Sequence, residues 1–202
     1  MKNAKAKLVL YKEFYKRGLY QFIPIGRLPD GNVFYPTSKQ KQALEYLNDK
    51  VTESIGYGGA ARSGKSVIEC MDALFISLCY DGVQIAICRK ELTNLKRTVL
   101  VTLFKLLSFY GIKMDDFNYN QQLNKITFSN GSVIYLIDTA YKPSDPLNTR
   151  FGGFELIRCY IDESNETSLQ VIDKLFERIG WGEGINYGLT RKMFECFNPD
   201  KN

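Results

Sequence analysis

Blocks of hydrophobic residues recur along the chain with two different spacings. Short continuous apolar runs are typical of buried strands, and apolar residues three or four positions apart are typical of helices. The predicted strands are 54–58, 83–88, 125–128, 133–137, 156–161 and 193–197. The predicted helices are 37–48, 64–80, 91–110 and 169–179. Strands that alternate with helices predict an α/β fold with a mostly parallel central sheet flanked by helices.

One pair of strands departs from this alternation. Residues 125–128 and 133–137 are separated only by Ser129-Asn130-Gly131-Ser132. An Asn-Gly pair supplies the positive φ angles of a type I′ turn, so we expect these two strands to form an antiparallel β-hairpin. Residues 138–153 are rich in Pro, Asp and Gly and are expected to form a loop.

The first 35 residues differ from the rest in composition. They are basic and aromatic, and a Leu-Pro-Asp-Gly-Asn turn over residues 28–32 lies near their end. We expect residues 1–35 to form an N-terminal segment packed on the domain formed by residues 36–202. Its aromatic side chains are expected to join the core rather than to stack on nucleic-acid bases.

The overall composition is that of a folded domain. The chain has 202 residues, of which 45% are hydrophobic and 24% are charged, so it can bury a core. The net charge of +5 permits an anionic partner without demonstrating one. Histidine is absent, which excludes the Ser-His-Asp triad, histidine-ligated zinc and imidazole acid–base chemistry. The five cysteines include no CxxC pair, which favours a reducing compartment over a disulfide framework.

Hydrophobic stretches in the sequence are too short for a membrane span, which needs roughly 20 apolar residues. The N-terminus also lacks the longer apolar run of a signal peptide. We therefore expect a soluble, intracellular protein without a membrane partner.

Residues 59–66 match a phosphate-binding loop (P-loop). Their sequence, Gly59-Ala60-Ala61-Arg62-Ser63-Gly64-Lys65-Ser66, fits G-x-x-x-x-G-K-[ST] between a predicted strand and a predicted helix. Backbone N–H groups of such a loop surround a β-phosphate at the positive end of the helix. The Lys65 ammonium then reaches the β- and γ-phosphates, and the Ser66 hydroxyl binds Mg²⁺. The expected cofactors are ATP and Mg²⁺.

An acidic pair follows the strand predicted over 156–161. Asp162 and Glu163 stand directly after this run, which Arg158 interrupts. Asp162 would hold Mg²⁺ together with Ser66, and Glu163 would orient and deprotonate an attacking water. Such a pair is typical of hydrolysing motors and distinguishes them from most P-loop kinases.

The order of these motifs resembles the N-terminal ATPase domain of the large terminase subunit of tailed bacteriophages. The resemblance runs from about Tyr35 to Pro199. Besides the P-loop and the acidic pair, it rests on four further segments: Phe34-Tyr35-Pro36-Thr37-Ser38-Lys39-Gln40, Cys88-Arg89-Lys90 with the helix behind it, Asn148-Thr149-Arg150-Phe151-Gly152, and Phe197-Asn198-Pro199.

This resemblance implies an additional-strand P-loop NTPase fold, in which the strand before Asn198 lies between the P-loop strand and the Asp162 strand. It also implies an ATPase motor that moves double-stranded DNA into a procapsid. The motor would be a homo-oligomeric ring on the portal protein in the host cytoplasm, working with the small terminase subunit. A nuclease domain normally follows in this family. Because the chain stops at Asn202, we expect ATP hydrolysis and no DNA cleavage from it.

The resemblance further implies roles for individual residues. Gln40 would read the adenine edge, and Asn198 would sense the γ-phosphate or hold the attacking water. Arg150 is the first candidate for an arginine finger and Arg62 the second, and the sequence leaves open which one acts and whether it acts in trans. Each of these residues also has a purely structural alternative. Arg150 would form an ion pair with Asp145, Gln40 would lie on the surface of its helix, and Asn198 would belong to an Asn-Pro turn.

Three other functions remain compatible with the motifs. A P-loop kinase would carry an arginine-rich lid, but Arg178 and Arg191 are isolated. A helicase-like DNA-dependent ATPase would need a strand-separating motif, which the sequence lacks. A non-enzymatic subunit with a relic P-loop is disfavoured by the intact lysine, serine and acidic pair. Any DNA contact is expected to be to phosphates, non-specific and salt-sensitive, because no base-reading motif is visible.

Overall fold

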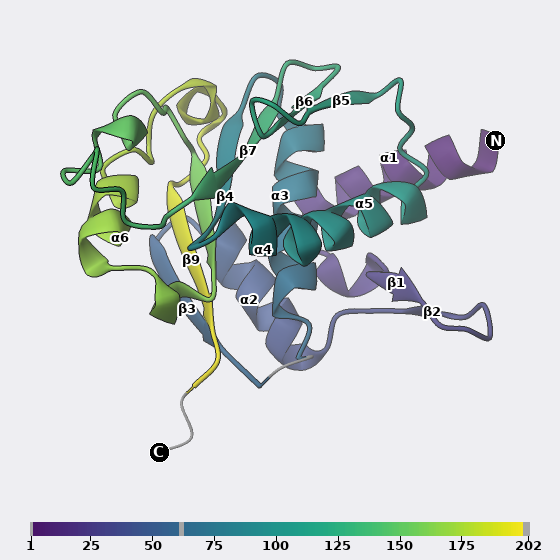
Figure 1. Cartoon of the computed structure of the whole chain (residues 1–202). Helices are drawn as coiled ribbons and strands as arrows, with labels where there is room; N and C mark the ends of the chain where they lie inside the picture. Colours follow the sequence, from purple (N-terminus) through teal and green to yellow (C-terminus); the bar gives the residue numbers. More distant parts are fainter. Residues whose placement is uncertain (1, 61–62, 200–202) are drawn as a thin grey trace.

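A computed structural model describes residues 2–60 and 63–199 of the chain. One sheet forms the centre, with helices on both sides of it (Figure 1). The sheet has seven strands in the order β3-β9-β8-β4-β7-β6-β5. In that order the strands are β3 (Ser54–Gly58), β9 (Lys192–Phe197), β8 (Arg158–Asp162), β4 (Gln84–Arg89), β7 (Val133–Asp138), β6 (Lys125–Phe128) and β5 (Phe117–Asn120).

Most of this sheet is parallel. The strands β3, β9, β8, β4 and β7 run parallel to one another, and β6 and β5 continue the sheet antiparallel. The strand β9, which leads to Asn198, lies between β3 and β8. The predicted α/β fold class and the predicted inserted strand are both confirmed.

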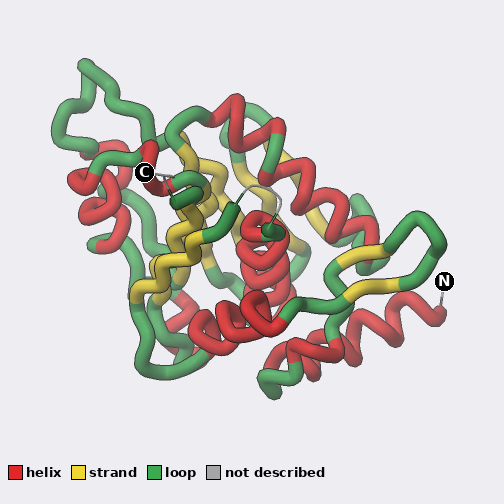
Figure 2. The backbone as a smooth tube through the Cα atoms, turned by 90° about the horizontal axis from the view of Figure 1, so that it is seen from below, coloured by secondary structure: helices red, strands yellow, loops and turns green. Residues whose placement is uncertain are grey.

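Helices cover the two faces of the sheet unequally (Figures 1 and 2). The helices are α1 (Lys2–Lys16), α2 (Ser38–Asn48), α3 (Lys65–Cys79), α4 (Leu92–Arg97), α5 (Val99–Phe109) and α6 (Leu169–Phe176). Successive side chains of a strand point to opposite faces. Accordingly, Ile85 and Ile87 of β4 join the core under α1, α2, α3 and α5, whereas Ala86 and Cys88 join the core under α6. No helix in the described ranges has the length and hydrophobicity that a bilayer crossing requires.

The start of α2 is fixed by a capping box. The Thr37 side chain accepts a hydrogen bond from the backbone N–H of Gln40, and the Gln40 side chain accepts one from the backbone N–H of Thr37. This reciprocal arrangement satisfies two N–H groups that a helix start would otherwise leave unpaired. The helix predicted over 37–48 is therefore confirmed, and its first turn also holds Gln40 in place.

The prediction of one long helix over residues 91–110 is wrong. It divides into α4 and α5 at Thr98, whose backbone adopts φ −115° and ψ −72°. The Thr98 hydroxyl donates to the carbonyl of Asn94 at 2.8 Å and accepts from the Arg89 guanidinium at 3.1 Å. Threonine hydroxyls compete with the helical backbone in this way, and the apolar periodicity on either side of Thr98 does not reveal it.

The hairpin between β6 and β7 forms, but the predicted type I′ turn is wrong. Gly131 has a positive φ of 82°, and Asn130 is not among the residues with positive φ. The Asn130 side chain instead donates to the carbonyl of Ser77 and to the Asp81 carboxylate, at the end of α3. The hairpin also gains a third antiparallel strand, β5, which the sequence analysis missed.

The N-terminal residues pack on the same core as α3. Tyr15, Tyr20, Ile23 and Ile25 are buried in that core. A short 3-10 turn (Tyr20–Phe22) follows α1, and a two-stranded ribbon of β1 (Gly26–Arg27) and β2 (Val33–Phe34) comes next.

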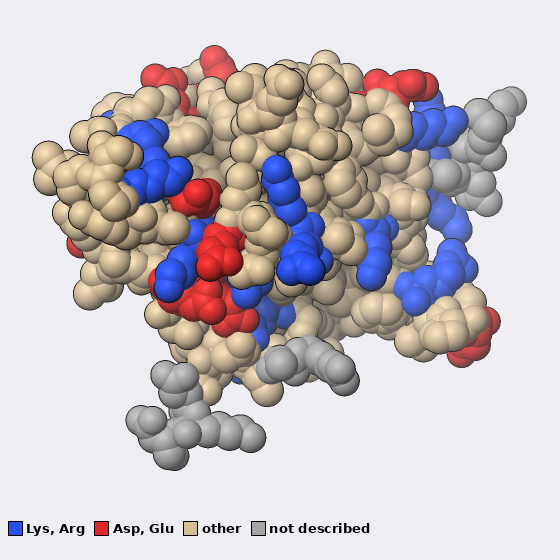
Figure 3. All heavy atoms as spheres, in the orientation of Figure 1, with Lys and Arg blue, Asp and Glu red and all other residues tan. Residues whose placement is uncertain are grey.

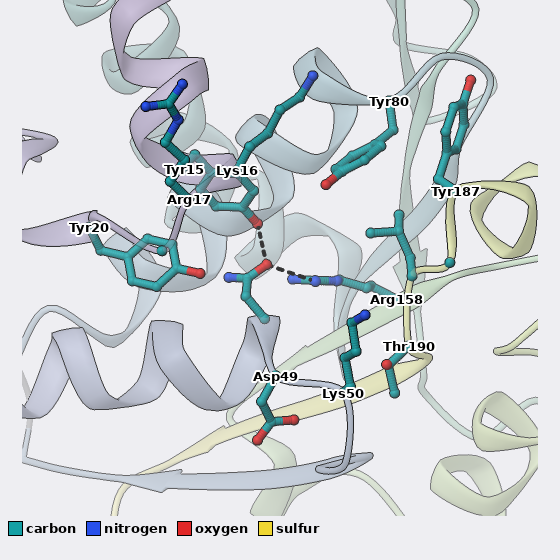
Figure 4. A pocket seen from close by; sticks show the side chains of 14 residues that line it. Tyr15, Lys16, Arg17, Tyr20, Asp49, Lys50, Tyr80, Arg158, Tyr187 and Thr190 are labelled. Carbon is teal, nitrogen blue, oxygen red and sulfur yellow. Dashed lines mark hydrogen bonds between the residues drawn. The ribbon is translucent and has the colours of Figure 1, made fainter.

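A buried polar network connects α1, α2 and α3 to the start of β8. The Asp72 carboxylate accepts hydrogen bonds from Tyr15, Asn48, Arg158 and Tyr160. The Tyr15 hydroxyl and the Arg158 guanidinium also lie 3.0 Å from the side-chain oxygen of Asn48, and dashed lines in Figure 4 mark both contacts. The network borders a cavity of about 450 Å³. Arg158, which breaks the apolar pattern in the sequence, is thus half of a buried ion pair.

Candidate functional site

The turn between β3 and α3 has glycine at two positions where a Cβ would lie too close to a neighbouring side chain. Gly64 has a positive φ of 79°, and a Cβ there would lie 2.4 Å from the side-chain nitrogen of Gln40. A Cβ at Gly59 would lie 2.7 Å from the Ser63 hydroxyl. The chain therefore makes a close turn into the N-terminus of α3, as a phosphate-binding loop does. Ala61 and Arg62, two of the predicted nucleotide contacts, lie outside the described residues.

Lys65 is buried against oxygen atoms. Its ammonium donates to the carbonyls of Gly59 at 2.6 Å and Ala60 at 3.3 Å, and to the side-chain oxygen of Asn198 at 2.7 Å. A lysine ammonium has three protons and no acceptor, so these contacts use its full capacity. Phosphate oxygens that enter the turn would replace some of these partners.

The predicted residues after β8 and β9 lie at one edge of the sheet, because both strands are parallel and end there. The Asn198 amide nitrogen donates to both Glu163 carboxylate oxygens, at 2.8 and 3.0 Å. Asn198 thereby links Glu163 to Lys65. Glu163 has φ 52° and ψ 55°, a left-handed conformation that is costly for a residue with a side chain. Because strained residues of this kind cluster at functional sites, Glu163 is a candidate functional residue.

These side chains border one cleft of about 320 Å³. The residues that line it are Ser63, Gly64, Lys65, Ser66, Val67, Arg89, Thr98, Asp162, Glu163 and Asn198. Residues 63–66 of the predicted P-loop, the acidic pair and Asn198 are therefore brought together, although they come from distant parts of the sequence.

Asp162 is the most buried carboxylate of the cleft and is 3% exposed. Burial raises its pKa, with Glu163 raising it further, while Arg89 and Lys65 act in the opposite direction. The Arg89 guanidinium donates to Asp162 at 2.9 Å. Glu69 of α3 is completely buried nearby, and burial together with Asp162 raises its pKa well above the ordinary value.

Two predicted residues lie outside this cleft. Gln40 lies behind the P-loop, where its side chain accepts from the backbone of Thr37 at 2.9 Å and donates to the Ser63 carbonyl at 3.4 Å. Arg150 forms an ion pair with Asp145 at 3.1 Å and donates to the carbonyl of Ala140 at 2.8 Å. The Asp145 contact is the structural alternative that the sequence left open for Arg150.

Arg89 and Thr98 are members of the cleft that the sequence patterns did not predict. Arg89 ends β4, the strand that pairs with β8, so it reaches the same sheet edge as Asp162. The available signal was a cation directly after a buried apolar strand, beside a strand that ends in two acids. For Thr98, the only signal was a β-branched hydroxyl residue inside a predicted helix.

The residues present fit a magnesium ion. Ser66 and Asp162 offer a hydroxyl and a carboxylate on the same cleft, and oxygen ligands are those that Mg²⁺ prefers. Within residues 2–60 and 63–199, no group of three or more His, Cys, Asp or Glu side chains is placed to hold a metal.

Comparisons with known proteins identify the fold. No protein-family model and no curated protein sequence matches the chain. The large terminase of a thermophilic bacteriophage is similar with a TM-score of 0.58 and 18% identity, over 80% of this chain and 38% of that one. The HK97 bacteriophage large terminase gives 0.63 and 12%, over 93% of this chain and 37% of that one. The large terminase ATPase domain of Thermus phage P74-26 gives 0.57 and 14%, over 83% and 66%.

The chain thus spans less than two fifths of the thermophilic-phage and HK97 proteins and about two thirds of the P74-26 ATPase domain. At these identities the similarity concerns the arrangement of strands and helices. The chain therefore shares the fold of the ATPase domains of bacteriophage large terminases.

Proposed function

We propose that this chain is an ATP-hydrolysing motor domain of a viral DNA-packaging terminase. The observation that carries the proposal is the single cleft that joins Lys65 and Ser66 of the P-loop to Asp162 and Glu163. A phosphate-binding loop that faces two adjacent carboxylates has the components needed to bind a triphosphate, hold its metal and activate a water.

The cleft residues that the sequence predicted have the following roles in this proposal. Lys65 and the backbone of residues 59–64 bind the β- and γ-phosphates, and Ser66 and Asp162 hold Mg²⁺. The metal would neutralise charge that develops on the phosphate oxygens. Glu163 accepts the proton of the attacking water. Asn198 keeps the Glu163 carboxylate in place and connects it to the phosphate-binding lysine.

Nucleotide binding is supported by the structural neighbours. Structures of the thermophilic-phage large terminase exist in complex with ADP and with ATP-γ-S. We carry over to this chain an adenine contact by Gln40, whose side chain already touches the P-loop at Ser63. Ala61 and Arg62 are retained as nucleotide contacts, with Arg62 as a second candidate finger. Arg150 remains a candidate to act in trans in a homo-oligomeric ring.

Double-stranded DNA is the proposed cargo, contacted through its phosphates. On the face shown in Figure 3, basic side chains extend across the surface over α4 and α5. Arg97 and Lys105 of these helices are exposed. The portal protein and the small terminase subunit are the proposed partners, and the procapsid in the host cytoplasm is the proposed place of action. Residues 36–202 would be the ATPase domain, with residues 1–35 packed on it and no nuclease activity in the chain.

The experiment that tests the proposal compares wild type with Lys65→Ala. Wild type should bind ATP in the presence of Mg²⁺ and release free phosphate. Loss of the charged contacts should lower the ATP affinity of Lys65→Ala by about tenfold to a hundredfold. Lys41→Ala, a partly exposed lysine of α2, is the matched control and should behave as wild type.

Other outcomes would contradict the proposal. A phosphorylated acceptor in place of free phosphate would identify a kinase. Failure of the wild-type chain to bind ATP would identify a non-enzymatic subunit. Circular dichroism spectra of all variants show whether each one is folded.

A further inference from the structure

Arg89 is held in the cleft by two contacts at its tip. One guanidinium nitrogen, Nη1, donates to Asp162 at 2.9 Å and to the Thr98 hydroxyl at 3.1 Å. The side chain is only 15% exposed. It lines the same cleft as Lys65 and Ser66. A second cation therefore lies where the proposed triphosphate binds.

The hydrogen bonding of Arg89 is incomplete. Its Nε atom is buried and has no hydrogen-bond partner among the described residues. A guanidinium has five N–H donors in a fork that matches the geometry of phosphate oxygens. An arginine in a buried cleft with unused donors is poised to accept an anionic ligand.

The carboxylate that now holds Arg89 is the one proposed to bind Mg²⁺. A cation at Asp162 competes with the guanidinium for the same oxygens, because both are held by charge. Binding of a metal-bound nucleotide therefore weakens the Arg89–Asp162 contact. It also brings a strong acceptor, the terminal phosphate, into the cleft that Arg89 lines.

We propose that Arg89 exchanges Asp162 for the γ-phosphate when the nucleotide binds, and so acts within its own subunit as the arginine that distinguishes ATP from ADP. This inference rests on the proposed function, because it requires a triphosphate in the cleft. Thr98 holds the other side of Nη1 during the exchange. The break between α4 and α5 thus places a hydroxyl that restrains the arginine near the phosphates.

The other candidate arginine of known position is less suited to this role within one chain. The Nε of Arg150, like that of Arg89, has no hydrogen-bond partner among the described residues, but its other nitrogens contact Asp145, the side chain of Asn148 at 3.2 Å and the carbonyl of Ala140. It does not line the cleft. A trans role for Arg150 and a cis role for Arg89 are compatible, since they concern different subunits of a ring.

The test measures the affinities of the full chain for ADP and for ATP-γ-S, each with Mg²⁺, by isothermal titration calorimetry. In Arg89→Ala we expect the affinity for ATP-γ-S to fall about tenfold or more, because a charge-assisted contact to the γ-phosphate is lost. The affinity for ADP should remain that of wild type. Lys90→Ala, an exposed cation at the next position, is the matched control and should leave both affinities unchanged.

Two results would overturn the proposal. The first is that Arg89→Ala keeps the wild-type affinity for both nucleotides. The second is an equal loss for both nucleotides, which would mean that Arg89 only neutralises Asp162. Failure of the proposed function gives a different result, in which wild type binds neither nucleotide. ATP turnover of Arg89→Ala is a second readout, and a fall of about 10³-fold is expected for an arginine on the transferred phosphate.

Discussion

Strand β8 has an arginine–aspartate ion pair at each end, and the two pairs differ in how many hydrogen bonds the carboxylate accepts. At its start Arg158 pairs with Asp72, and these side chains are 2% and 0% exposed. At its end Asp162 pairs with Arg89, and these side chains are 4% and 15% exposed. The two pairs thus share a strand and a type of chemistry, but they lie in different surroundings.

The partners explain the difference. Asp72 receives hydrogen bonds from four side chains contributed by α1, α2 and β8. Asp162 receives a side-chain hydrogen bond from Arg89 alone within the described part of the chain. A saturated carboxylate can only hold its neighbours together, whereas a carboxylate with unused acceptor positions can bind a ligand. The number of hydrogen bonds that the carboxylate accepts therefore distinguishes the structural end of β8 from the candidate functional end.

The largest effect on stability is expected from breaking the Arg158–Asp72 pair, whose carboxylate accepts four hydrogen bonds. In Arg158→Ala the carboxylate of Asp72 would remain buried without its cation, which lowers the free energy of unfolding by about 3–5 kcal/mol. Urea denaturation followed by circular dichroism measures this loss. Arg89→Ala should lose less, because its pair borders an open cleft.

The exposed Arg97→Ala is the control for this comparison and should unfold like wild type. Equal losses in Arg158→Ala and Arg89→Ala would contradict the distinction between the two ends of β8.

A smaller effect should appear at alkaline pH. Burial raises the pKa of Tyr15 and of Tyr160 well above the ordinary value, and the adjacent Asp72 raises both further. The unfolded chain loses these protons near pH 10 while the folded chain keeps them, so stability is complete below that pH and falls above it. The slope is about 1.4 kcal/mol per pH unit for each tyrosine.

Tyr160→Phe removes one of these phenols and should therefore lose stability less steeply between about pH 10 and 11. Tyr141→Phe, which changes an exposed side chain, is the control and should follow wild type. The measurement is the free energy of unfolding in urea at a series of pH values. Parallel curves for wild type and Tyr160→Phe would contradict a buried, protonated Tyr160.

The position of the cleft could be predicted from the sequence, because its signals are local. A glycine-rich turn between a strand and a helix, and polar residues directly after strands, locate Lys65, Asp162, Glu163 and Asn198 at one edge of a parallel sheet. The sequence also predicted the α/β fold, since apolar runs and helical periodicity are local patterns. The structure brings these four residues together, and their individual roles stay predictions.

The two ion pairs could not be predicted, because they depend on residues far apart in the chain. Arg158 lies 86 positions from Asp72, and Arg89 lies 73 positions from Asp162. In the sequence Arg158 only weakened the strand pattern, and Asp72 only interrupted an apolar helix. A buried charge is stable only next to a partner of opposite charge, so neither pair can be predicted before that partner is known.

Two predictions of local structure were wrong for the same physical reason. Thr98 breaks a helix while its hydroxyl is bound to Arg89, and Asn130 uses its side chain to hold the end of α3 instead of entering the αL region. In both cases the residue does not adopt the conformation that its neighbours in the sequence favour, and its side chain forms a hydrogen bond to another element of the fold.

The central claim is that the cleft between the P-loop and the acidic pair hydrolyses ATP, and Glu163→Gln tests it most directly. The measurement is single-turnover release of phosphate from ATP by wild type and Glu163→Gln, with the exposed Glu166→Gln as control. We predict that Glu163→Gln still binds ATP but releases phosphate about 10²- to 10⁴-fold more slowly, while Glu166→Gln keeps the wild-type rate. Phosphate release at the wild-type rate by Glu163→Gln would contradict the account.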